Sequence, residues 1–144
     1  MSEINLQSQE DSHHALGAVI SFLSYSHLHK FLFLSDLEWL VMPPVALGQY
    51  RLLCRNGAPI AYASWACVSE DVDARLEAGN LRLRPGDWAS GSQLWLIDFV
   101  VAADDLQAVL VILSATVFEG VEIRILRGQE MNACGDFESR NFHV

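Results

Sequence analysis

The dipeptide Asn56-Gly57 separates two apolar runs and is the short feature that most constrains the fold of this chain. Residues 49–55 read QYRLLCR, and residues 60–68 read IAYASWACV. Asparagine and glycine adopt a positive φ at low cost, and together they favour the two-residue turn that joins antiparallel strands. The spacing therefore predicts a β-hairpin built from these two runs.

The segments before the hairpin predict helices. Ser12 is a suitable N-cap for a helix over residues 13–24, in which apolar residues recur at the spacing of one helix face. The segment 35–45, SDLEWLVMPPV, predicts a short helix capped by Ser35. We expect Pro43-Pro44 to end that helix in a turn, because proline lacks a donor and restricts the residue before it.

After the hairpin, the sequence predicts a short acidic helix and then a β-α-β unit. Ser69 caps the segment EDVDARLEAG, whose acidic first turn suits the positive end of a helix. Residues 93–102 read QLWLIDFVVA and predict a central strand. A helix follows Asp104-Asp105, where we expect Asp104 to act as the cap, and residues 121–126 predict the returning parallel strand through a right-handed crossover.

These elements indicate an α/β (α+β) chain with one mixed sheet and flanking helices. At 144 residues the chain is long enough for one domain with a real core. We assign residues 1–11 to a flexible arm, residues 12–127 to the domain and residues 128–144 to an irregular tail.

Composition narrows the class of protein. The chain is 51% hydrophobic and 19% charged, which excludes a disordered protein. No apolar run reaches the roughly 20 residues of a membrane helix, so no integral membrane association is expected. The polar, acidic start MSEINLQSQEDSHH does not resemble an export signal, and we expect a cytoplasmic protein.

Charge and ligand spacing exclude further classes. The net charge of −9 argues against nucleic acid and anionic membranes as partners, and suits a basic or lysine-presenting one. The three cysteines form no CxxC pair, and the histidines are not matched by a second ligand cluster. No metal site is expected.

Two features could carry chemistry. Asp98 is the acidic residue within the apolar run LWLIDFVV, and the stretch SYSHLHKFLF places His27 and His29 one residue apart. Each has an ordinary interpretation: Asp98 can face solvent, and the histidines can be structural. Alternatively, a buried Asp98 needs a partner, and a histidine bonded to a carboxylate is arranged as a general base.

The order of motifs resembles the toxin-activating lysine acyltransferases. It runs from a helix through Ser26-His27-Leu28-His29-Lys30 and FLFLSDLEWLVMPPV to NGAPIAYASWA, and then through an acidic helix to LRPGDWASGSQLWLID. The resemblance covers about residues 15–102. It implies a fold similar to the GNAT N-acyltransferases, and an enzyme that moves a fatty acyl chain from acyl carrier protein to internal lysines of RTX protoxins.

The same resemblance implies the site residues. The histidine of the family's S-P-L-H-R segment falls on His29, and the serine beside it falls on Ser26. His27 stands at the usual proline position and inherits no role. The family's aspartate falls on Asp98, the residue that the apolar strand had already singled out.

The chemistry implied for these residues is proton transfer. A lysine ammonium has a pKa near 10.4, so removing its proton at pH 7 costs roughly 4–5 kcal/mol. A neutral His29 oriented by Asp98 can accept that proton as the amine attacks the thioester, and an acyl-histidine intermediate is also conceivable. The donor is a phosphopantetheine thioester substrate, no bound cofactor is expected, and homodimers are common in the family.

One departure bears on the donor. Val101-Ala102-Ala103-Asp104-Asp105 follows the aspartate strand, where the family commonly has an A-P-F-G-like loop. Two aspartates would repel phosphate, which favours a singly phosphorylated carrier arm over coenzyme A. The alternative functions are a non-catalytic member of the fold that binds a protein or acyl ligand, and a CoA-dependent small-amine acyltransferase, for which the Q/R-x-x-G-x-G/A loop is missing.

Overall fold

A mixed sheet forms the centre of the molecule. The computed structural model describes residues 4–6, 12–27, 29–80, 82–119, 122–125 and 142–143. Over these residues, the strands pair in sequence order: β1 (Ile4–Leu6), β2 (Tyr50–Arg55), β3 (Ala58–Val68), β4 (Gln93–Val101), β5 (Glu122–Ile125) and β6 (Phe142–His143). Strands β4 and β5 are parallel and the other neighbours are antiparallel. The predicted α+β class and mixed sheet are confirmed.

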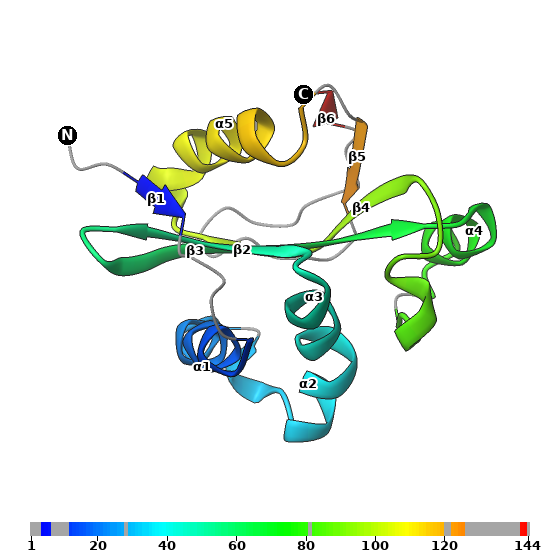
Figure 1. The fold of residues 1–144 in the computed structure, drawn as a ribbon, viewed down its shortest axis with the longest axis horizontal. Coiled ribbons are helices and arrows are strands. Elements are labelled where there is room, and N and C mark those ends of the chain that lie inside the picture. The colour runs from blue at the N-terminus through cyan, green and yellow to red at the C-terminus, as the bar shows by residue number, and fades with distance from the viewer. Residues whose placement is uncertain are drawn as a thin grey trace.

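Helices cover both faces of this sheet (Figure 1). Helices α1 (Ser12–Leu23), α2 (Leu34–Leu40) and α3 (Met42–Leu47) lie on one face, and α5 (Leu106–Thr116) lies on the other. Helix α4 (Glu70–Glu77) lies at one end of the sheet. Because α5 links the parallel strands β4 and β5, it completes the predicted β-α-β unit.

The predicted hairpin is confirmed. Asn56 has φ 53° and Gly57 has φ 79°, so both turn residues occupy the left-handed region that a two-residue hairpin turn requires. Strand β3 then runs antiparallel to both β2 and β4. The hairpin therefore supplies two of the three strands that form the middle of the sheet.

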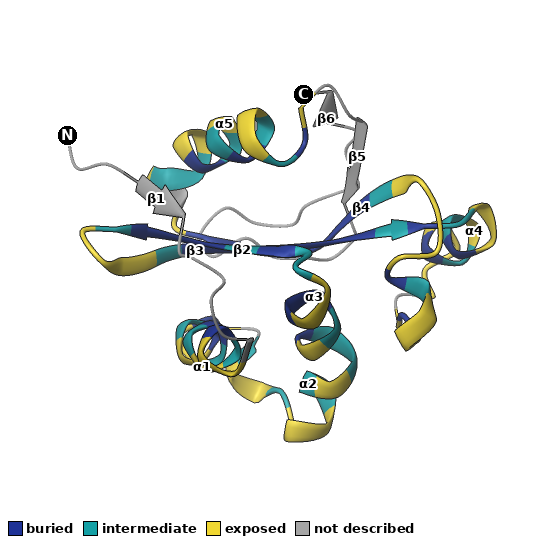
Figure 2. Ribbon diagram, in the orientation of Figure 1, coloured by how far each residue is buried: buried dark blue, intermediate teal, exposed yellow. Residues whose placement is uncertain are grey.

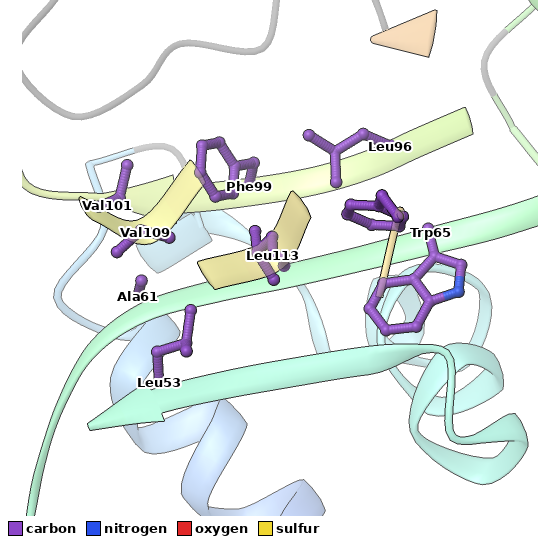
Figure 3. Packing of buried hydrophobic residues seen from close by; sticks show 10 residues of the cluster. Leu53, Ala61, Trp65, Leu96, Phe99, Val101, Val109 and Leu113 are labelled. Atoms are coloured by element: carbon purple, nitrogen blue, oxygen red, sulfur yellow. The ribbon is translucent and has the colours of Figure 1, made fainter. Parts of the chain in front are cut away.

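The face of the sheet under α5 forms one core cluster (Figure 3). Trp65 on β3 meets Phe118 edge-on, with ring centroids 5.2 Å apart. Apolar side chains from β2, β3, β4, α5 and the residues just after α5 fill this layer: Leu53, Ala61, Ala63, Trp65, Leu96, Phe99, Val101, Val109, Leu113 and Phe118.

The opposite face carries two further clusters. One lies under α1 and α3, and the other lies near α4. Figure 2 shows the central strands buried and the outer sides of the helices exposed. The first cluster contains Ala15, Val19, Leu23, Val41, Val45, Tyr50, Leu52, Tyr62 and Val100. The second contains Ala66, Val68, Val72, Leu76, Leu83, Trp88, Trp95 and Ile97.

The segment 35–45 differs from its prediction. Helix α2 begins at Leu34, so Ser35 lies inside the helix and Phe33 is the residue at the N-cap position. The Asp36 carboxylate accepts a hydrogen bond from the Phe33 backbone N–H at 2.8 Å. Pro43-Pro44 does not form the expected turn after the helix, because both prolines lie at the start of helix α3. Proline is tolerated there since the first N–H groups of a helix have no partner within it.

The chain ends and the start of α5 also differ from expectation. Within the expected arm 1–11, Ile4–Leu6 form strand β1 against β2, and within the expected tail Phe142–His143 form β6. The rest of both segments lies outside the described residues.

Asp105, not Asp104, is the residue before α5, and it makes no side-chain cap. Its carboxylate instead accepts a hydrogen bond from Arg55 at 2.8 Å.

A pair of glycine substitutions tests this packing. A Cβ at Gly91 would lie 2.5 Å from the Val68 carbonyl oxygen, whereas a Cβ at Gly17 in α1 meets nothing within 4 Å. We expect Gly91→Ala to lower the free energy of unfolding by about 1–3 kcal/mol, because backbone must move. Gly17→Ala should raise it by about 0.5–1 kcal/mol. Denaturant unfolding measures both, and equal effects would contradict this packing.

Candidate functional site

Ser26 and His29 lie on the turn that follows α1. The Ser26 N–H donates to the Leu23 carbonyl at 2.9 Å, and a 3₁₀ turn spans His29–Phe31. Ser26 Oγ lies 2.7 Å from His29 Nδ1. His27, between them, is exposed. The local turn thus brings Ser26 and His29 together and leaves His27 in solvent.

Asp98 reaches the same face of the sheet through a β-bulge in β4. Ser64 pairs with Asp98, but Trp65 pairs with Leu96, so Ile97 is the extra residue. Leu96 belongs to the cluster under α5 and Ile97 to the opposite face. Strict alternation would return Asp98 to the side of Leu96. The bulge keeps it on the face where His29 lies.

His29 and Asp98 are in direct contact, although 69 residues separate them in sequence. His29 Nε2 lies 2.8 Å from Asp98 Oδ1 and 2.7 Å from Oδ2. The side chain of His29 is 9% exposed and that of Asp98 is 2% exposed. Asp98 therefore does not face solvent, and its partner is the histidine that the sequence nominated.

The two contacts fix the roles of the ring nitrogens. An ionised carboxylate only accepts hydrogen bonds, so Nε2 must carry the proton that faces Asp98. In neutral imidazole, Nδ1 then holds the lone pair and accepts from the Ser26 hydroxyl. This arrangement can pass a proton from the Ser26 side to Nδ1 while Asp98 stabilises the imidazolium that forms.

Two hydroxyl-bearing residues line the site beneath Asp98. Ser64 and Tyr62 on β3 are both fully buried. Burial raises the pKa of Tyr62 strongly, and the negative charge of Asp98 raises it further, while the neighbouring Ser64 hydroxyl opposes the rise. Sequence reasoning did not nominate these residues. Their alternation along the predicted strand was the sequence signal that could have placed them on one face, and the register that sets Ser64 opposite Asp98 is visible only in the structure.

Other candidate features do not join this site. His13 and His14 are exposed on α1. Within the described residues, no group of three or more histidine, cysteine or acidic side chains is placed to hold a metal ion. Among the same residues, no helix has the length and apolar character needed to cross a membrane.

A double-mutant cycle tests the pairing. His29→Ala leaves the buried Asp98 carboxylate without the N–H donor it contacts, so we expect it to destabilise the protein more than Asp98→Ala does. The coupling free energy should be about 1–3 kcal/mol, and the exposed His27→Ala should change the free energy of unfolding by less than about 0.5 kcal/mol. Additive effects of the two substitutions, measured by denaturant unfolding, would show that the pair does not interact.

Comparison with known proteins places these observations in a family. A family model described as the RTX toxin acyltransferase family matches residues 8–136. The protein-lysine myristoyltransferase RtxC of Kingella kingae is 29% identical over 133 residues, which make up 91% of this chain and 80% of that relative.

Two further relatives extend the comparison. The protein-lysine palmitoyltransferase CyaC of Bordetella bronchiseptica is 28% identical over 140 residues, or 94% of this chain and 76% of CyaC. The leukotoxin-activating lysine-acyltransferase LtxC of Aggregatibacter actinomycetemcomitans is 39% identical over 85 residues, 59% of this chain, and the match spans only 51% of LtxC. The predicted resemblance is confirmed: the chain belongs to the RTX toxin acyltransferase family.

Proposed function

We propose that this chain is a protein-lysine acyltransferase that moves a fatty acyl group from acyl carrier protein to internal lysines of an RTX-type protein, with His29 as general base. The relatives named as lysine acyltransferases support the reaction class. The observation that carries the proposal is the buried relay of Ser26, His29 and Asp98. A cytoplasmic location and a homodimeric state belong to the same proposal.

The reaction that this relay would serve is a balanced transfer. The lysine ammonium first gives one proton to solvent, and its neutral nitrogen then attacks the thioester carbonyl carbon, so that a C–N bond forms and the C–S bond breaks. The proton lost by the amine moves to His29 Nδ1, directly or through the Ser26 hydroxyl, and His29 then returns it to the departing thiolate. Asp98 stabilises the imidazolium between these two steps. Ser26 orients Nδ1 and is not the acyl carrier in this scheme.

Exposed apolar side chains close to the relay in sequence suit a fatty acyl substrate. Tyr25, Phe31 and Phe33 flank Ser26 and His29 in sequence and are 76–84% exposed. Large exposed apolar side chains gathered in one place are characteristic of interaction sites. The relatives named as a myristoyltransferase and a palmitoyltransferase make a long acyl chain the natural substrate to propose.

The start of α5 supports acyl carrier protein as donor. Asp105 precedes the helix and is paired with Arg55, and Asp104 beside it is exposed. Because Arg55 offsets the charge of Asp105, the exposed carboxylate of Asp104 supplies the negative charge that disfavours the several phosphates of coenzyme A more than the single phosphate of a carrier arm.

Transfer to lysine is the direct test. Purified protein, myristoyl- or palmitoyl-acyl carrier protein and an RTX-type acceptor are combined, and the acceptor is examined by tandem mass spectrometry. We expect an acyl mass on internal lysines, and a rate at least tenfold lower with the matching acyl-CoA. His29→Ala should lower kcat by about 10²–10⁴-fold, because the general base is lost.

His27→Ala is the matched control, since it removes an exposed imidazole two residues away, and it should leave the rate unchanged. If wild-type protein transfers no acyl group from any acyl carrier protein, the proposed reaction is wrong. The non-catalytic alternative then predicts that His29→Ala leaves the binding of acyl carrier protein and acceptor intact.

A further inference from the structure

The buried carboxylate of Asp98 has fewer donors than it can accept from. A carboxylate offers about four lone-pair sites. Within the part of the chain that the structure describes, both oxygens of the Asp98 carboxylate accept from the same donor atom, His29 Nε2. A buried anion served by a single N–H group is poorly compensated.

Two buried hydroxyl groups near Asp98 lack an acceptor for their protons. Tyr62 and Ser64 are both 0% exposed. Among the described residues, neither the Tyr62 hydroxyl oxygen nor Ser64 Oγ has a hydrogen-bond partner by distance and angle. The two hydroxyls are nevertheless near neighbours, since Ser64 lowers the pKa of Tyr62 against the effect of burial. Leaving such a group unsatisfied costs stability, so a native structure rarely does so without a reason.

The sheet register places these hydroxyls next to the carboxylate. Ser64 is directly opposite Asp98, and Tyr62 is opposite Val100, so the two hydroxyl-bearing residues share the face of Asp98. Opposed residues have Cβ atoms about 4.5–5.5 Å apart, and diagonal neighbours remain within reach of a tyrosine ring. The rise in the Tyr62 pKa, caused by burial and then by the charge of Asp98, agrees with this proximity.

We propose that Tyr62 and Ser64 are positioning residues for Asp98, whose hydroxyls donate to its carboxylate directly or through one enclosed water. A buried water needs two to four polar partners, and Asp98, Tyr62 and Ser64 supply three. This donor layer holds the carboxylate in the orientation that receives His29 Nε2. The expected effect of this layer on kcat rests on the proposed function, whereas its effect on the protonation of His29 does not.

The donor layer acts on His29 through the charge of Asp98. His29 reaches Asp98 from the turn after α1, and Tyr62 and Ser64 approach it from β3. Tyr50 on β2 pairs with Ser64, on the side of β3 away from β4, and its ring centroid lies 6.5 Å from that of Tyr62. Hydroxyl dipoles aimed at the carboxylate offset part of its negative charge, so that Asp98 stabilises the imidazolium form of His29 less strongly. Without them, Asp98 attracts the imidazolium more strongly, and His29 retains its proton to higher pH.

NMR titration of the histidine side chains tests the proposal without any acyl transfer. The resonance of His29 is assigned by its loss in His29→Gln. We expect Ser64→Ala and Tyr62→Phe each to move the midpoint of the His29 titration upward by about 0.5 pH or more. Tyr50→Phe, which removes the same atom from the neighbouring ring, should leave it unmoved.

The outcomes separate the two proposals. An unchanged His29 midpoint in both folded variants overturns the positioning role, whatever the enzyme does. Tyr62→Phe keeps the ring in place, so it preserves this test if Ser64→Ala fails to fold. Where wild-type protein transfers acyl groups, the variants should lower kcat by about threefold on the acidic limb of the pH profile, with KM unchanged. A rise in KM alone would contradict the role.

Discussion

The hydrogen bond from His29 Nε2 to the buried carboxylate of Asp98 is the interaction on which the rest of this structure depends. It joins the turn after α1 to the middle of β4 across 69 residues. Because Asp98 is almost wholly removed from water, it requires a partner with a proton to donate, and the turn that presents His29 satisfies that requirement. The same bond leaves Nδ1 as the lone-pair nitrogen and points it at Ser26. The contact that compensates the charge of Asp98 therefore also sets the geometry on which the proposed catalysis depends.

Two features of the sheet bring Asp98 to the face on which His29 lies. The hairpin at Asn56-Gly57 sets β3 beside β4, and the bulge at Ile97 turns Asp98 toward the helices α1–α3. Membership in the RTX toxin acyltransferase family makes proton transfer the relevant chemistry, since an amine nitrogen releases a proton when it forms an amide with an acyl group. Burial strengthens the electrostatic effect of Asp98 on His29 at the place where that proton would be received.

Local sequence signals predicted much of the fold, and the resemblance selected the three site residues that the structure brings together. The hairpin and the β-α-β unit were predictable because turn chemistry and apolar periodicity act over a few residues. The bulge was not, because every neighbour of Asp98 in LWLIDFVV is apolar and its pattern does not distinguish the two faces. The prediction that Pro43-Pro44 forms a turn was wrong because proline is common both after the end of a helix and in its first turn. The roles of Tyr62 and Ser64 depend on register with a distant strand, which no short motif encodes.

The tautomer of His29 is the most direct measure of the central claim. Long-range ¹H–¹⁵N correlation spectra of ¹⁵N-histidine protein, recorded above the His29 titration, report which ring nitrogen carries the proton. The account predicts a proton on Nε2 and a lone pair on Nδ1, and Asp98→Asn should weaken that preference. A wild-type His29 protonated on Nδ1 would contradict it, since Nε2 could not then donate to Asp98 and Nδ1 could not act as the base.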